Sequence, residues 1–150
     1  MKLAALFSGG KDSTYALYLA KKFNYKVACL ITLDSKNKDS YMFHTLVDNV
    51  DSIAEKMQLP LIKFSTEGKK ERELADLKKA IKKAVKEHEI EGIVTGAIAS
   101  AYQASRVQKI CNELDIYCFN PLWQKDQVEL LKELINNNFI RVLLSVIASD

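Results

Sequence analysis

The chain has 150 residues, is 48% hydrophobic and carries a formal net charge of +3, from 22 Lys and Arg against 19 Asp and Glu. This length allows one substantial core and is too short for two ordinary domains, so we expect one domain over residues 1–150. The small positive excess is spread along predicted helices, which argues against nucleic acid as an obligatory partner. No apolar stretch approaches the length of a membrane span, and Met1 and Lys2 do not open a signal peptide. We therefore expect a cytoplasmic protein without a membrane partner, and the sequence leaves a homo-oligomer open.

An apolar segment at residues 3–7 leads directly into the run Ser8-Gly9-Gly10-Lys11-Asp12-Ser13. Adjacent glycines let backbone N–H groups close around a phosphate, and a helix that starts here aims its positive end at the same point. The spacing excludes the Walker loop, which needs a glycine where Ala5 stands, and the dinucleotide fingerprint, which needs three spaced glycines. A plain strand-to-helix turn is the alternative. We predict that all six residues, Ser8, Gly9, Gly10, Lys11, Asp12 and Ser13, bind nucleotide phosphates.

The side chains of this loop suit phosphate chemistry. A cradle that holds the β- and γ-phosphates leaves the α-phosphorus open to attack, with Lys11 stabilising the charge on departing pyrophosphate. A carboxylate beside phosphates needs a cation between them, which makes Asp12 a candidate Mg²⁺ ligand, directly or through water. We assign catalytic roles to Lys11 and Asp12. The alternative for Asp12 is a helix N-cap.

Apolar runs of strand length alternate with segments of helical period along the chain. The predicted strands are residues 3–7, 27–33, 61–64, 92–95, 116–119 and 140–146, and the helical patterns cover residues 15–22, 46–57, 74–85, 102–114 and 130–135. Strands that read as continuous Val, Ile and Leu, each followed by a helix, predict a three-layer α/β/α fold with a mostly parallel sheet. We interpret the charged stretch at residues 67–83 as the solvated face of an amphipathic helix.

A second group of candidate residues follows the fourth predicted strand. Ligands in such folds lie beyond the carboxyl ends of the strands, so Gly96 and the glycine loop can face each other across one crevice. Gly96 permits close backbone approach to a ligand, and Ser100 can cap the next helix. Tyr102, Gln103 and Arg106 share part of one helical face and together suit a carboxylate or phosphate substrate. The alternative is a surface helix with an Arg salt bridge.

Four further features have weaker functional signals. Tyr41 and His44 precede a helix at the edge of the crevice, where His44 is either a general base or a helix-start residue. We interpret Trp123 as a core or interface residue, with a substrate lid as the alternative. Cys29, Cys111 and Cys118 form no Cys-x-x-Cys pair, so we expect core thiols rather than redox or metal sites.

The sequence resembles the diphthine–ammonia ligase family, which belongs to the PP-loop superfamily of N-type ATP pyrophosphatases. The matching segments are residues 1–13, 39–45, 59–61, 91–93, 96–98, Tyr102-Gln103, Arg106-Val107 and Pro121-Leu122-Trp123. The resemblance runs from residue 1 to about residue 145. It implies an adenine-nucleotide α-hydrolase-like fold, with residues 1–150 as a PP-loop ATP-binding domain, ATP as cosubstrate and Mg²⁺ as its cation.

The resemblance also implies a reaction, in which ATP drives amidation of the diphthine carboxylate of elongation factor 2 by ammonium, releasing AMP and pyrophosphate. On this basis Arg106 is a catalytic residue, and Tyr41, His44, Ser100, Tyr102, Gln103 and Arg106 bind the substrate. The family continues into a region with a Glu-Gly-Gly-Glu-Tyr-Glu-Thr motif that this chain does not contain, so ATP binding is better supported than full ligase activity. The alternatives are a non-catalytic ATP- or AMP-binding module and a PP-loop tRNA-modifying enzyme.

Overall fold

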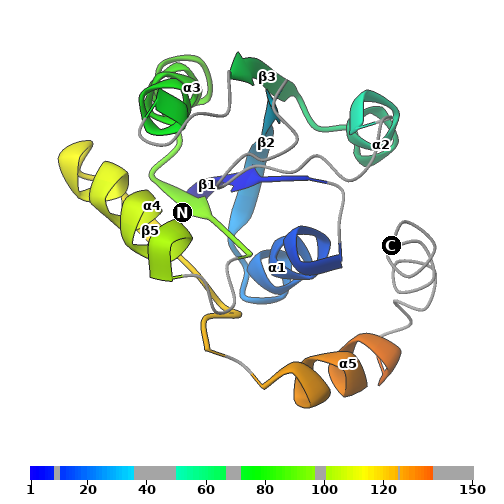
Figure 1. Cartoon of the computed structure of the whole chain (residues 1–150). Helices are drawn as coiled ribbons and strands as arrows, with labels where there is room; N and C mark the ends of the chain where they lie inside the picture. Colours follow the sequence, from blue (N-terminus) through cyan, green and yellow to red (C-terminus); the bar gives the residue numbers. More distant parts are fainter. Residues whose placement is uncertain (9–10, 36–49, 67–71, 97–100, 125, 137–150) are drawn as a thin grey trace.

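Strands and helices alternate along the whole part of the chain that the structure, a computed structural model, describes: residues 1–8, 11–35, 50–66, 72–96, 101–124 and 126–136. In chain order the elements are β1 (Lys2–Leu6), α1 (Lys11–Lys22), β2 (Lys26–Ser35), α2 (Val50–Met57), β3 (Leu61–Thr66), α3 (Arg72–His88), β4 (Gly92–Val94), α4 (Ala101–Glu113), β5 (Tyr117–Phe119) and α5 (Gln127–Asn136) (Figure 1). The five predicted strand-helix repeats are therefore confirmed. The strand predicted at residues 140–146, and the beginning of the second predicted helix, lie outside the described residues.

The five strands form one parallel sheet in the order β3-β2-β1-β4-β5. The central strand β1 pairs with β2 on one edge and with β4 on the other. Strands β2 and β3 are thus added on one side of β1, and after β3 the chain crosses back to add β4 and β5 on the other side. Parallel strands need long crossovers, which the helices supply. The predicted parallel α/β fold is confirmed.

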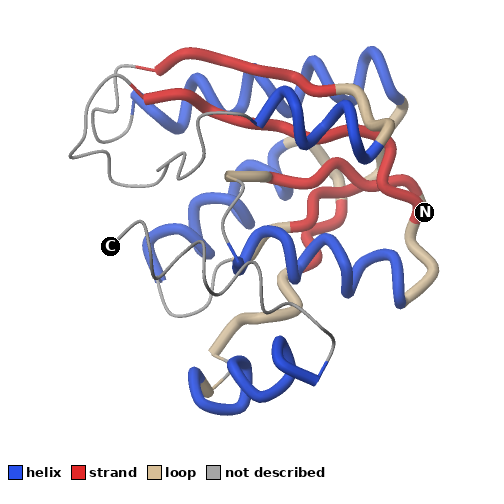
Figure 2. Tube along the Cα trace, turned by 90° about the vertical axis from the view of Figure 1, so that its right-hand side faces the viewer, coloured by secondary structure: helices blue, strands red, loops and turns tan. Residues whose placement is uncertain are grey.

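Helices cover both faces of the sheet and create two separate buried clusters (Figures 1 and 2). On one face, Leu3 and Ala5 of β1 pack in a cluster with residues of α1, α2 and α5. On the other face, Ala4 packs in a cluster with residues of α3 and α4. Neighbouring residues of a strand point to opposite faces, so a single segment of β1 supplies both cores. The result is the predicted three-layer α/β/α arrangement.

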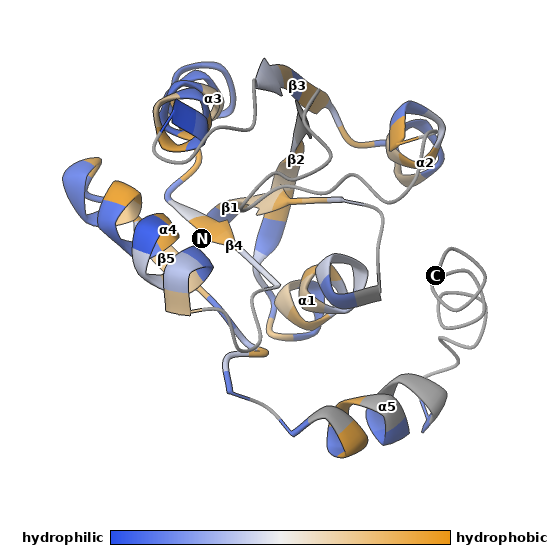
Figure 3. Ribbon diagram, viewed as in Figure 1, coloured by the Kyte–Doolittle hydropathy of each residue, from blue (hydrophilic) through white to orange (hydrophobic). Residues whose placement is uncertain are grey.

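The long helix α3 confirms the interpretation of the charged stretch as a solvated face for residues 72–83, whereas residues 67–71 lie outside the described residues. Leu77 and Ile81 are fully buried, whereas Lys79 and Lys82 are exposed. Figure 3 shows the same division, with hydrophilic colour over much of the outer side of α3. Among the described helices, none is both long and apolar enough to cross a bilayer.

Four helices end at a residue in the left-handed conformation although none ends in glycine. Asn24, Gln58, Glu89 and Asp115 have φ angles of 66°, 58°, 54° and 54°, in the left-handed region. At the ends of α1, α2 and α4, the residue after the left-handed one donates its N–H to a carbonyl of the last helical turn. These bonds are Tyr25 to Ala20 (3.0 Å), Leu59 to Ala54 (3.1 Å) and Ile116 to Cys111 (2.9 Å). This pattern is the Schellman motif, which stops α1, α2 and α4 and directs the chain into the next strand. Helix α3 ends instead with the simpler αL motif, in which the Glu89 N–H donates to the Val85 carbonyl at 3.1 Å.

The helix α5 is attached to α1 by a polar contact between residues far apart in the sequence. The Tyr15 hydroxyl donates a hydrogen bond to Glu133 Oε2 at 2.9 Å, and Leu130 of α5 is buried in the same cluster as Tyr15. Burial and the neighbouring Glu133 carboxylate raise the pKa of Tyr15 to about 12. The contact therefore holds as long as the phenol keeps its proton.

Replacement of Tyr15 by Phe should destabilise the protein by about 1–3 kcal/mol, because a hydrogen bond to a charged group is lost. The folded-state pKa lies above the ordinary value, so the contribution of the Tyr15 hydroxyl is complete below pH 10 and is lost as the pH rises toward 12. Urea unfolding of both proteins across this range measures the difference. A gap between wild type and Tyr15→Phe that stays constant from pH 8 to about pH 12 would contradict the assignment.

Candidate functional site

The glycine loop leaves the sheet at the point where strand order reverses. It follows β1, and the strands on either side of β1 continue to β3 in one direction and to β5 in the other. In open α/β sheets the crevice at such a reversal is the usual place for a ligand. The topology thus puts the run that begins at Ser8 where the sequence predicts a binding site.

A buried threonine fixes the exit of β1 toward this loop. Thr32 is 1% exposed and donates a hydrogen bond from its hydroxyl to the Phe7 carbonyl at 2.7 Å. The Phe7 N–H in turn donates to Ile31 O at 2.9 Å. Thr32 was not among the predicted site residues, and its only signal in the sequence is a hydroxyl-bearing residue within the apolar run of β2.

The two serines of the loop lie side by side. The Ser8 N–H donates to Ser13 Oγ at 3.3 Å, and the two hydroxyl oxygens are 3.2 Å apart. Ser13 belongs to the first turn of α1, which begins at Lys11. The ends of the loop are thereby brought together at the positive end of a helix, an arrangement that attracts anions. Gly9, Gly10 and the side chain of Lys11 lie outside the described residues.

Asp12 lies in the first turn of α1, which begins at Lys11. Within the described residues there is no group of three or more His, Cys, Asp or Glu that could hold a metal ion alone. Mg²⁺ commonly needs only one or two carboxylates when phosphate oxygens and water complete its coordination. One carboxylate, that of Asp12 beside the glycine loop, matches that donor set.

Gly96 touches the backbone of the same helical turn. A Cβ atom on Gly96 would lie 2.8 Å from the Asp12 carbonyl oxygen and 3.0 Å from the Ser13 nitrogen. Real Cβ atoms do not approach backbone so closely, so only glycine fits here. We predicted that Gly96 and the glycine loop face each other, because both follow the carboxyl ends of strands. The contact with Asp12 and Ser13 confirms that they lie close together. The close approach is to the loop's own helix, whereas we expected an approach to the ligand.

The predicted shared face on α4 is confirmed for Tyr102 and Arg106. The guanidinium carbon of Arg106 lies 4.3 Å from the centre of the Tyr102 ring, a cation–π distance. Arg106 Nη1 donates to Ser105 Oγ at 3.3 Å, and that hydroxyl donates to the Tyr102 carbonyl at 3.3 Å. Tyr102 also packs against the buried cluster beneath α3 and α4. Its ring therefore supports Arg106 and is at the same time part of the core.

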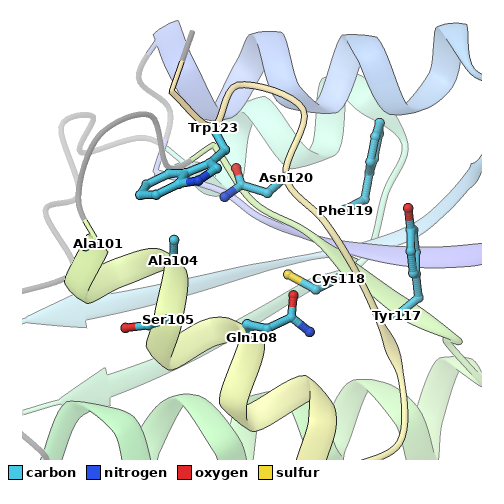
Figure 4. A pocket seen from close by; sticks show the side chains of 9 residues that line it. All are labelled: Ala101, Ala104, Ser105, Gln108, Tyr117, Cys118, Phe119, Asn120 and Trp123. Atoms are coloured by element: carbon cyan, nitrogen blue, oxygen red, sulfur yellow. The ribbon is translucent and has the colours of Figure 1, made fainter.

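A cavity of about 570 Å³ opens between α4 and the segment that leaves β5. Figure 4 shows its walls. It is lined by Ala101, Ala104, Ser105, Gln108, Tyr117, Cys118, Phe119, Asn120 and Trp123. This cavity was not predicted, because its α4 wall is a face of small and polar residues that carries no distinctive pattern. Trp123, which we expected in a core or interface, is 36% exposed and forms one wall.

Several predicted site residues cannot be placed. Tyr41, His44 and Ser100 lie outside the described residues, and their substrate-binding roles stay predictions. Gln103 is partly buried near the start of α4. The structure thus brings together two groups: Ser8, Asp12 and Ser13 with Gly96, and Tyr102 with Arg106.

A parallel α/β sheet with a glycine loop and a helix N-terminus at its reversal point is an arrangement common among α/β proteins that bind nucleotides. The chain matches the family described as "Diphthamide synthase N-terminal domain" over residues 1–117 and belongs to that family.

Curated relatives agree with this assignment. The chain is 34% identical to "Diphthine--ammonia ligase" of Bos taurus and of Homo sapiens, and 33% identical to that of Schizosaccharomyces pombe. Each match covers 99% of this chain. The chain spans 62% of the length of the two mammalian relatives and 27% of the yeast one.

A solved structure, "The crystal structure of predicted subunit of tRNA methyltransferase from Methanocaldococcus jannaschii DSM", has the same fold with a TM-score of 0.53. At 17% identity it covers 88% of this chain and 73% of its own. At this level of identity the likeness concerns the fold alone.

Substitution Gly96→Ala should displace the first turn of α1 and destabilise the protein by about 1–3 kcal/mol, the usual cost of overpacking. Gly92→Ala is a matched control, because its Cβ would lie 2.7 Å from the Tyr117 carbonyl oxygen at the other end of β4. Hydrogen–deuterium exchange of the amides of residues 12–14 should accelerate in Gly96→Ala and not in Gly92→Ala. Equal acceleration in both variants would show that the Gly96 contact does not hold the loop.

Proposed function

We propose that this chain is the ATP-binding part of a diphthine–ammonia ligase, with residues 1–150 as one PP-loop ATP pyrophosphatase domain that acts in the cytoplasm. The observation that carries the proposal is the contact of Gly96 with Asp12 and Ser13 at the reversal point of the sheet. It supports a site built from the loop after β1 and the segment after β4. Membership of the family supplies the reaction.

In this proposal the loop holds ATP by its terminal phosphates. The N–H groups of Gly9 and Gly10, the hydroxyls of Ser8 and Ser13, and the positive end of α1 bind the β- and γ-phosphate oxygens. Lys11 adds a charge that stabilises pyrophosphate as it leaves. Mg²⁺, bound through Asp12, would neutralise phosphate charge.

Amidation of a carboxylate needs activation, because direct attack by ammonia would have to expel oxide. The diphthine carboxylate of elongation factor 2 attacks the α-phosphorus of ATP, forming an acyl–phosphate bond as the bond to pyrophosphate breaks. Ammonia then attacks the acyl carbon and AMP departs, leaving the amide. The loop residues hold the terminal phosphates in place while the α-phosphorus stays open.

We assign the carboxylate to the second group of residues. Arg106 is presented on the first two turns of α4 and stacked on Tyr102 at 4.3 Å, which limits its rotamers and lowers the entropy cost of binding an anion. A guanidinium binds a carboxylate through two parallel hydrogen bonds. Gln103 can donate a further bond. Tyr41, His44 and Ser100 complete the substrate side in this proposal.

The direct test combines the chain with ATP, Mg²⁺, ammonium and diphthine-bearing elongation factor 2. AMP should form only when all components are present, with amidated elongation factor 2 detected by mass spectrometry. Tight ATP binding without AMP would support the non-catalytic binding module instead. AMP formation that depends on tRNA would support a tRNA-modifying enzyme.

Lys11→Ala should weaken ATP binding by about 1.5–3 kcal/mol, the scale of a charge-assisted contact, without unfolding the protein. Isothermal titration calorimetry with ATP measures the change. Lys21→Ala is the control, since Lys21 is exposed in the last turn of the same helix, and it should bind ATP like the wild type. Unchanged affinity in Lys11→Ala would remove Lys11 from the phosphate site.

Arg106→Ala should leave ATP affinity unchanged. It should reduce AMP formation with the carboxylate substrate by about 10- to 150-fold, because the carboxylate loses a charged hydrogen-bond partner. The exposed Lys109, farther along α4, provides the control variant Lys109→Ala. Steady-state kinetics at saturating ATP separate the two expectations. A fall in ATP affinity would move Arg106 to the nucleotide side.

A further inference from the structure

A thiol that the proposed reaction does not use lines the cavity between α4 and β5. Cys118 is the middle residue of β5, and its neighbours Tyr117 and Phe119 pack their rings in an aromatic cluster with Tyr25. Cys118 instead packs with the buried cluster of α3 and α4. In Figure 4 its sulfur atom points into the cavity toward α4. Cys118 is half-buried and belongs to the lining of the cavity.

A second thiol lies against the first. Cys111, in the last part of α4, is 0% exposed and hydrogen-bonds through its side chain to Cys118. The two cysteines stand on either side of the turn that ends α4. That turn is held closed by the bond from the Ile116 N–H to the Cys111 carbonyl at 2.9 Å. The pair is thus fixed by the helix end and by the start of β5.

We propose that Cys118 is an oxidant-reactive modification site and that Cys111 converts its oxidised form into an intramolecular disulfide. Three observations carry the proposal: Cys118 borders an open cavity, it packs against the buried cluster that contains a second thiol, Cys111, and that second thiol is shielded from solvent. This is the arrangement of a reactive cysteine poised next to a resolving one. The inference concerns a site apart from the proposed nucleotide loop.

The electrostatics of the pair agree with this assignment. The hydrogen bond from Cys111 lowers the pKa of the Cys118 thiol, so Cys118 supplies the thiolate. The same hydrogen bond and burial raise the pKa of Cys111. Cys29 is a natural comparison, because burial raises its pKa to about 11 and it is fully buried. The thiolate is the nucleophilic form of cysteine, so Cys118 and not Cys29 should react.

The chemistry takes place in two steps with a hydroperoxide as the oxidant. The Cys118 thiolate attacks the terminal peroxide oxygen: an S–O bond forms, the O–O bond breaks, and an alcohol, or water from hydrogen peroxide, leaves after taking up a proton. Sulfur loses two electrons and the peroxide gains them. Cys111 sulfur then attacks Cys118 sulfur, the S–S bond forms, and the sulfenic oxygen leaves as water with the Cys111 proton. A dithiol reductant restores both thiols.

The test treats the purified chain of residues 1–150 with hydrogen peroxide and follows intact mass and peptide maps. The wild type should become about 2 Da lighter and yield a Cys111–Cys118 cross-linked peptide, reversibly on addition of dithiothreitol. Cys111→Ser should instead gain about 16 Da at Cys118 and be trapped there by dimedone. Cys29→Ser is the matched control, because it also removes a buried thiol and should oxidise like the wild type.

A second measurement does not depend on disulfide formation. In the folded wild type, a small thiol reagent should label Cys118 about tenfold faster than Cys29 or more, with circular dichroism showing that each variant is folded. Cys118→Ser should lose this fast phase. Labelling of Cys29 as fast as Cys118, or peroxide treatment that yields no cross-link in the wild type and no sulfenate in Cys111→Ser, would overturn the proposal.

Discussion

The pairing of β1 on both of its edges is the constraint on which the described structure depends. The strand is five residues long and connects two half-sheets that would otherwise share no ladder. Its small residues Ala4 and Ala5 are buried toward opposite faces and admit the helical layers closely. Because strand order reverses at β1, the chain that leaves it starts at the point where open α/β sheets usually bind ligands. The central place of β1 in the sheet therefore also decides where the candidate site lies.

Close backbone packing then sets the shape of that crevice. Gly96 lies against Asp12 and Ser13 with no room for a side chain, while Thr32 holds the end of β1 through Phe7. The loop is consequently supported from the strands on both sides of β1. Support of this kind lowers the entropy that a phosphate-binding loop loses when a ligand binds. Neutral hydroxyl and N–H donors can then bind an anion with useful affinity, because little free energy is lost in ordering them.

Local patterns predicted most of the fold, whereas contacts between distant segments escaped prediction. Helix α3 could be predicted because Leu77 and Ile81 recur at helical spacing among charges, and the parallel sheet because its strands lack alternation. The proximity of Gly96 to the loop followed from strand order. The bond from Tyr15 to Glu133 joins residues 118 positions apart, and no local pattern encodes it. The cavity beside Cys118 depends likewise on how α4, β5 and Trp123 meet.

The left-handed helix ends at Asn24, Gln58, Glu89 and Asp115 have an energetic consequence. A side chain in this conformation costs about 1–2 kcal/mol relative to the right-handed region, less for Asn and Asp, and glycine does not pay this cost. Each of these residues precedes a strand of the parallel sheet, so they lie at the amino-terminal ends of the strands, whereas the glycine loop follows the carboxyl end of β1. Glycine at these positions would remove this conformational cost and so stabilise the fold without changing the end of the sheet that carries the candidate site.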